Sequence, residues 1–256
     1  MPLLLPGDAV TALPTPSKPG ATLKLGPGLT HIPPSEVSAH KAGQLIVDAR
    51  KNALWIESNS RRYIPSPQDA VIATILRSSA DSYICAISSS TSPAPSSVQA
   101  TLPHLAFPNA TKKTRPILQP GSTVYARVSL ANKHMDPELE CFDAETGKAS
   151  GFGELKGGMV FSVSLGLARR LLGDGKKMRQ VARRAGEEWE GGHGAEVLEE
   201  LGKSLAFECA VGRNGKVWID SEDVKTTLLV GRCIIASETM TADEVRELVR
   251  VELAQG

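Results

Sequence analysis

Aromatic side chains and long apolar runs are scarce in this chain. Only 4% of its 256 residues are Phe, Trp or Tyr, and no uninterrupted apolar stretch reaches the ~20 residues of a transmembrane helix. The four cysteines form no CxxC pair and have no His at zinc spacing, so neither a disulfide framework nor a zinc knuckle is indicated. The N-terminal residues lack the basic segment followed by an apolar stretch that is typical of a secretory signal peptide. We therefore expect a soluble protein of the nucleus or cytoplasm, without a metal, a cofactor or a membrane partner.

The composition is that of a globular protein, with 41% hydrophobic and 22% charged residues. At ~150 residues per domain the length allows one large domain or two to three small ones. The formal net charge is +1, but residues 1–135 hold 13 of the 29 Lys and Arg and only 6 of the 28 Asp and Glu. The basic front part favours an anionic partner, although a solubilised surface produces the same imbalance.

Residue patterns divide the chain into three domains. Eight of the 17 prolines lie in the first 34 residues, which favours short strands and turns over helices and predicts a small β domain over residues 1–61. Residues 62–150 contain five short strand-like runs with a long connection between the third and fourth, as in a five-stranded OB-type barrel. Residues 151–256 mix strand and helix patterns. The predicted fold is multidomain, all-β followed by α+β.

The expected elements follow from periodicity and turn signals. In the first domain the strands are 22–25, 43–49 and 53–58. In the barrel they are 70–76, 82–87, 98–102, 123–130 and 138–142. In the third domain the strands are 160–164, 204–211 and 216–220, and the helices are 165–172, 195–203, 222–236 and 241–254. Thr241 and Glu244 have the spacing of a capping box for the last helix.

A basic cluster lies in the predicted barrel. OB barrels bind oligonucleotides on one face and through two loops, which here are residues 77–81 and 131–137. The candidate RNA-binding residues are Lys112, Lys113, Arg115, Arg127 and Lys133. Few aromatic residues accompany them, so contact with backbone phosphates is favoured over base recognition. A solvated polar loop remains the alternative interpretation.

Gly212-Arg213-Asn214-Gly215 allows two interpretations. A KH domain uses a G-x-x-G loop to clamp nucleic-acid backbone, but that clamp joins helices. Here the motif lies between two apolar alternating runs, where Asn-Gly indicates a tight hairpin with positive φ values. We therefore interpret Gly212, Asn214 and Gly215 as a structural hairpin and Trp218 as a buried anchor.

No catalytic apparatus is apparent, and we expect no catalytic residue. No G-x-S-x-G elbow occurs. Asp136, Glu138 and Glu140 alternate along a predicted strand and could in principle hold Mg²⁺, although a solvated strand face is far more frequent for such a short motif.

Several short motifs occur in a specific order along most of the chain. They are Leu4-Leu-Pro-Gly-Asp8, Gly26-Pro-Gly28, Arg62-Tyr-Ile-Pro65, Asp69-Ala-Val-Ile72, Ala110-Thr-Lys-Lys113 with Arg115-Pro116, Ala131-Asn-Lys-His-Met-Asp-Pro-Glu138, Leu165-Gly-Leu167 with Arg170-Leu-Leu172, and Gly212-Arg-Asn-Gly-Lys-Val-Trp218. In this order they resemble the ribosomal RNA-processing protein 40 family, cap subunits of the RNA exosome.

The resemblance implies an N-terminal β domain, an S1-type OB barrel and a KH-type domain whose G-x-N-G signature packs against the barrel. It also implies a non-catalytic subunit that sits on a ring of RNase PH-like proteins beside other cap subunits. Such a subunit stabilises the ring and guides RNA into it for 3′-to-5′ processing and degradation, including ribosomal RNA maturation and surveillance, in the nucleus and nucleolus and also in the cytoplasm. The Ser/Pro-rich stretch at 88–97 departs from the family pattern.

Two other functions remain open. A free-standing RNA-binding regulator would use the same barrel and KH modules. A metal-dependent nuclease would use Asp136, Glu138 and Glu140 and would cleave RNA in the presence of Mg²⁺.

Overall fold

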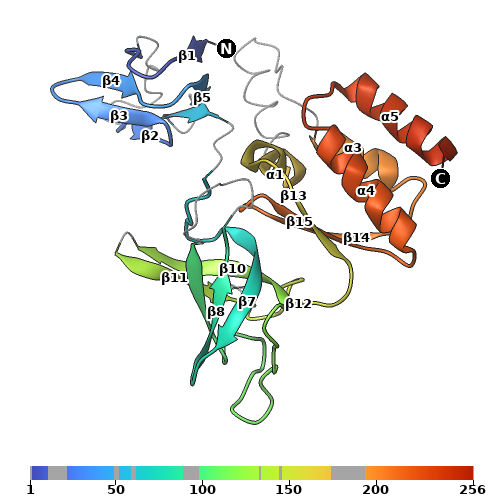
Figure 1. Ribbon diagram of the computed structural model, residues 1–256. Coiled ribbons are helices and arrows are strands. Elements are labelled where there is room, and N and C mark those ends of the chain that lie inside the picture. Colours follow the sequence, from blue (N-terminus) through green and yellow to red (C-terminus); the bar gives the residue numbers. More distant parts are fainter. Residues whose placement is uncertain are drawn as a thin grey trace. The chain divides into compact units, whose positions relative to one another are not determined.

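The protein is described here from a computed structural model, which covers residues 2–10, 22–48, 52–58, 62–88, 98–132, 134–143, 146–173 and 194–255 (Figure 1). The chain divides into two compact units. The first contains Met1–Ser60, and the second contains Arg61–Gly175 and Gly192–Gly256. Among the described residues, no helix is long and apolar enough to cross a membrane.

The first unit is a small β domain. Its strands are β1 (Leu3–Leu4), β2 (Lys24–Leu25), β3 (Leu29–Ile32), β4 (Glu36–Ala39), β5 (Gly43–Asp48) and β6 (Ala53–Glu57). They form a sheet of order β1-β5-β6-β2 and a separate β3-β4 hairpin. Leu29 and Val37 of the hairpin pack with Leu45 and Leu54 of the sheet in one core. The three expected strands are present, but the β3-β4 hairpin was not predicted, because its exposed residues hide the alternation of its few buried ones.

The second unit begins with a closed five-stranded barrel, which confirms the predicted OB architecture. The barrel strands are β7 (Ala70–Ser78), β8 (Ser82–Ala86), β9 (Gln99–Pro103), β10 (Thr123–Asn132) and β11 (Met135–Glu140). The sheet has the order β11-β9-β8-β7-β10-β12, and pairing of β11 with β10 closes it. Alternate residues such as Tyr83 and Cys85 point into the core, which is the period of two expected of a strand with one buried face.

A short sixth strand in this sheet was not predicted. It is β12 (Gly153–Leu155), which pairs with the start of β10. Three residues that include a glycine carry no usable alternation, so only tertiary pairing reveals it.

The remaining part of the second unit is an α+β domain, as expected. Its strands β13 (Met159–Ser162), β14 (Glu208–Gly212) and β15 (Lys216–Asp220) form a sheet of order β13-β15-β14. Its helices are α1 (Leu165–Leu171), α3 (Gly194–Leu201), α4 (Val224–Ala236) and α5 (Ala242–Gln255). Helices α3, α4 and α5 lie on one side of the sheet (Figure 1) and share a core with it, to which Val217, Ile219, Val230 and Val245 contribute.

Candidate nucleic-acid interface

The basic residues of the long connection lie on a loop that the barrel holds in place. This loop joins β9 to β10, and its ends are anchored by the buried side chains of Phe107 and Leu118. The hydroxyl of Tyr83, from β8, donates a hydrogen bond to the carbonyl of Pro116 at 2.8 Å. The same oxygen accepts one from the backbone N–H of Leu118 at 3.2 Å. The loop is therefore fastened to the neighbouring strand at its C-terminal end.

Arg115 is attached to the barrel through His104, which directly follows β9. Its Nη1 lies 2.7 Å from Nδ1 of His104, and because a guanidinium only donates, Nδ1 is the acceptor. The imidazole is only 4% exposed, and its ring lies 4.3 Å from that of Tyr83. Burial, followed by the Arg115 charge, lowers the pKa of His104. Both effects favour the neutral imidazole, whose Nδ1 orients Arg115 at the base of the loop.

Lys112 and Lys113 occupy the exposed tip of this loop. A turn in which the Thr111 and Thr114 hydroxyls lie 2.8 Å apart shapes the tip. Neither lysine forms an ion pair with another described residue. With Arg115 they place three positive charges on one short, anchored segment. Such an arrangement can neutralise successive backbone phosphates without reading bases.

Arg127, expected to bind RNA, is engaged by other side chains of the barrel. Its side chain is 8% exposed and forms a salt bridge with Glu140, and its Nη1 donates to Oε1 of Gln68 at 2.7 Å. Its charge is therefore compensated by Glu140 on the face of β10 opposite to the core residues Ala126 and Val128, and its share in phosphate binding stays a prediction. Lys133 lies outside the described residues.

The barrel presents no aromatic platform for base stacking in its described part. Tyr125 stacks on Phe152 with ring centroids 5.0 Å apart and donates its hydroxyl to the carbonyl of Val211 at 3.3 Å. Phe107 is buried. The outward, half-buried side chains of β8 and β9 are uncharged and non-aromatic: Ser82, Ile84, Ala86, Thr101 and Pro103. RNA contact by this barrel would thus depend on its basic loop.

The G-x-N-G segment forms the turn between β14 and β15. Gly212 pairs with Lys216, so the turn contains three residues. Gly215 has a φ of +76°, and Asn214 is not among the described residues with positive φ. The hairpin is therefore present, but its loop is three residues long with a left-handed last residue, instead of a two-residue Asn-Gly turn.

This hairpin is joined to the barrel by a buried amide. Asn214 is fully buried, and its Nδ2 donates to the carbonyls of Ile72 at 2.8 Å and Ile87 at 3.1 Å. Its Oδ1 accepts from the backbone N–H of Ile72 at 3.2 Å. A Cβ on Gly212 would lie 2.8 Å from the same nitrogen of Ile72, so this position requires a glycine.

Two further contacts complete the hairpin. The backbone N–H of Arg213 donates to the carbonyl of Ala70 at 2.8 Å. Trp218 is 6% exposed, and its indole N–H donates to the carbonyl of Gly157 at 3.0 Å. Both observations agree with a structural G-x-N-G segment and a buried tryptophan.

The three alternating carboxylates have unlike surroundings. Glu140 is engaged by Arg127, Glu138 is half-buried and Asp136 is exposed. Within the described ranges, no group of three or more His, Cys, Asp or Glu side chains is placed to hold a metal ion.

Sequence reasoning missed Tyr83 and His104 as the residues that position the basic loop. Tyr83 and His104 lie 21 residues apart in the chain, and the antiparallel pairing of β8 with β9 brings them together. No local sequence signal indicates this contact.

The fold and this site define a class of protein that joins an S1-type barrel to a KH-type domain. Family models match residues 23–62 (Rrp40 N-terminal domain), 63–153 (exosome complex component RRP40, S1 domain) and 158–225 (KH domain). The chain belongs to the RRP40 family.

Curated relatives agree with this assignment. The chain is 41% identical over 227 residues to exosome complex component rrp40 of Schizosaccharomyces pombe, covering 87% of this chain and 83% of the relative. It is 36% identical over 237 residues to RRP40 of Saccharomyces cerevisiae, covering 91% and 87%.

A solved structure supports the fold. A crystal structure provisionally described as an exosome complex RNA-binding protein superimposes with a TM-score of 0.54 at 17% identity, covering 75% of this chain and 98% of that one.

Proposed function

We propose that this protein is a non-catalytic, RNA-binding cap subunit of the RNA exosome. It stabilises a ring of RNase PH-like subunits, contacts other cap subunits and guides RNA towards the ring for 3′-to-5′ processing and degradation. The observation that carries the proposal is family membership along nearly the whole chain, since relatives named exosome complex component RRP40 cover 87% and 91% of it. The proposed location is the nucleus and nucleolus, with a cytoplasmic pool.

The first test is affinity purification of the tagged protein from its own cells, with mass spectrometry and a native size measurement. We expect stoichiometric RNase PH-like subunits in one large particle. Recovery of a lone small protein would contradict the proposal and favour the free-standing RNA-binding regulator. Fluorescent tagging tests the location, for which exclusion from the nucleolus would be the contrary result.

We assign the RNA contact to Lys112, Lys113 and Arg115. These cations share one anchored loop, which supports phosphate binding without base recognition. Replacing Lys112 and Lys113 by Ala should weaken binding of single-stranded oligo(U) RNA. The slope of log affinity against log salt should fall by about 0.7 per lost phosphate contact.

The matched control for this experiment is Lys225→Ala, which removes an exposed lysine from α4. Its salt slope should equal that of the unchanged protein. An unchanged slope in the Lys112→Ala/Lys113→Ala variant would remove this loop from the RNA path.

We also propose that the chain itself cuts no RNA. Glu140 is already paired with Arg127, so the three-carboxylate site would have to break a buried ion pair to bind Mg²⁺. The purified chain should leave RNA intact with or without Mg²⁺. Cleavage that disappears in Asp136→Ala would instead establish the nuclease alternative.

A further inference from the structure

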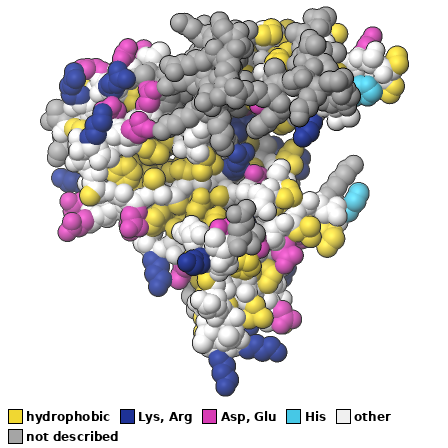
Figure 2. Space-filling model, turned by 180° about the vertical axis from the view of Figure 1, so that it is seen from behind, with side chains coloured by type: hydrophobic (Ala, Val, Ile, Leu, Met, Phe, Trp, Pro, Cys, Tyr) yellow, Lys and Arg dark blue, Asp and Glu magenta, His cyan; other side chains and the backbone are white. Residues whose placement is uncertain are grey.

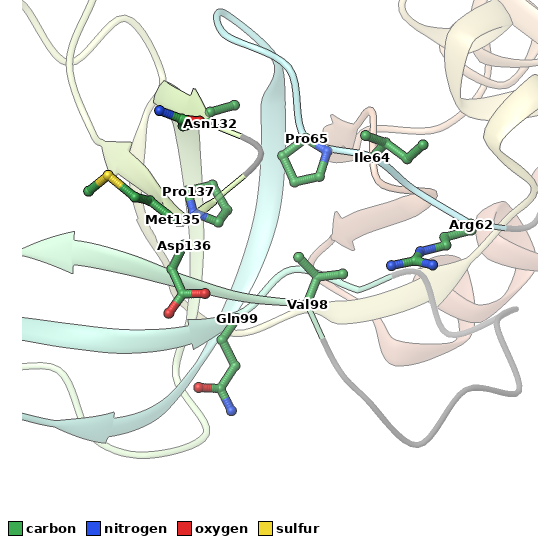
Figure 3. A pocket seen from close by; sticks show the side chains of 10 residues that line it. Arg62, Ile64, Pro65, Val98, Gln99, Asn132, Met135, Asp136 and Pro137 are labelled. Carbon is green, nitrogen blue, oxygen red and sulfur yellow. The ribbon is translucent and has the colours of Figure 1, made fainter.

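A second surface of the barrel lies at the other end of β9 from the basic loop. Strands β9 and β11 pair in parallel only at Thr101 and Glu138. Where the two strands begin, they border an open groove of about 880 Å³, formed with residues that precede β7 (Figure 3).

Six of the ten residues that line this groove are apolar, and the other four are polar or charged. Ile64 is 67% and Met135 is 61% exposed, and Pro65, Val98 and Pro137 also line the groove (Figure 3). Single exposed apolar residues are common on protein surfaces, but several that line one concavity mark an interaction site. The burial of these side chains by a partner would remove apolar surface from water.

The charges around the groove identify the kind of partner. Arg62 lies at one side, and Asp136 lies on the other, near Gln99 (Figure 3). Neither Arg62 nor Asp136 forms an ion pair with a described residue. The described lining of the groove therefore offers one positive and one negative group, with apolar side chains between them. A nucleic acid fits the described lining poorly, because the carboxylate of Asp136 repels phosphate.

We propose that this groove is the docking site for an extended segment of a neighbouring protein subunit. The segment places an apolar side chain beside Met135, a carboxylate towards Arg62 and a basic side chain towards Asp136 and Gln99. This inference rests on the proposed function, which supplies neighbouring subunits. The two ends of β9 then have different roles: a protein partner docks where the strand begins, and RNA contacts the loop that follows its end. Asn132, Met135 and Asp136, from the loop expected to bind RNA, then belong to the protein-docking end.

The first experiment places a charge in the apolar part of the groove. Met135→Glu should weaken association of the purified full-length chain with reconstituted ring subunits at least tenfold, as loss of a central interface anchor does. Leu130→Glu is the matched control, since Leu130 is 46% exposed on the partner strand of the same hairpin but lies outside the groove. This control should associate normally. Both variants should keep the thermal stability and the RNA affinity of the unchanged chain.

The second experiment tests the charges and identifies the occupant. Arg62→Glu should also weaken association, by roughly tenfold. A benzoylphenylalanine photocrosslinker at position 135 of the assembled complex should form an adduct with one segment of another subunit that carries both an acidic and a basic residue. A crosslink to RNA, to a second copy of this chain or to the chain itself, or no crosslink, would overturn the proposal.

The outcomes separate this inference from the proposed function. If the unchanged protein does not associate with the ring subunits at all, the cap-subunit assignment fails. If it associates and Met135→Glu associates equally well, only the docking groove is refuted. Loss of RNA affinity in isolated Met135→Glu would assign the groove to RNA and overturn the inference as well.

Discussion

Asn214 shows how one side chain connects two domains of this protein. Its amide makes three hydrogen bonds to the backbone at Ile72 and Ile87 of the barrel, and the residue is fully buried. A buried backbone N–H or carbonyl that loses its hydrogen-bond partner destabilises the folded state by its full desolvation free energy.

Asn214→Ala should therefore lower the free energy of unfolding by about 2–4 kcal/mol, because it leaves buried carbonyl and N–H groups unsatisfied. Urea unfolding followed by circular dichroism measures this change. Gln119→Ala is the control, since that residue is exposed and its replacement should cost less than about 0.5 kcal/mol. Equal stability of the two variants would contradict a structural role for Asn214.

Gly215 has a φ of +76°, a conformation that costs other L-residues about 1–2 kcal/mol and β-branched residues more. Gly215→Val should thus lower the melting temperature, whereas Gly215→Asn should be tolerated better. Thermal melting distinguishes this structural role from a nucleic-acid clamp. If the segment were a clamp, the Gly215→Val variant would melt normally and lose RNA affinity.

At the scale of elements, helix α5 is stabilised at its start by Glu244. The carboxylate accepts from the backbone N–H of Thr241 at 2.8 Å and from its hydroxyl at 3.0 Å. The bond from the Thr241 N–H to the Glu244 carboxylate is one of the two hydrogen bonds of the predicted capping box. The Thr241 hydroxyl donates to the same carboxylate.

These two hydrogen bonds lower the pKa of Glu244 below its usual value of 4.5. Because the folded-state pKa is depressed, the stabilisation is fully present above the unfolded-state pKa and is lost as the pH falls through the folded-state pKa. Glu244→Gln should therefore be less stable than the unchanged protein at neutral pH, and the difference should shrink on acidification. Denaturant melts across that pH range measure it, with exposed Glu222→Gln as a control that shows no comparable difference.

At the scale of the whole molecule, the barrel and the KH-type domain form one compact unit, and the N-terminal β domain forms another. The contacts of Asn214, Arg213 and Tyr125 cross between barrel and KH-type domain. Domains that share buried contacts unfold cooperatively, whereas separate compact units unfold independently.

Calorimetry should thus show the barrel and the KH-type domain melting in one transition. Native-state hydrogen exchange should give the same opening free energy for core amides of β7 and β15. Asn214→Ala should separate these two values. Independent melting of the two domains in the unchanged protein would show that the hairpin contacts contribute little coupling.

Local patterns in the sequence predicted most strands and helices, because burial on one face imposes a period of two on a strand and about 3.6 on a helix. The five barrel strands, the G-x-N-G hairpin and the last helix illustrate this. The β3-β4 hairpin and β12 were missed because short or mostly exposed segments leave no such period.

The sequence by itself determined the order of domains, the family and the basic character of one loop, since each depends on residues adjacent in the chain. Only the tertiary structure decided that Arg127 is neutralised by Glu140, that His104 and Tyr83 orient the loop, and that Ile64, Met135 and Val98 line one groove. The physical reason is that burial and charge compensation arise between strands, whose pairing joins residues far apart in the chain.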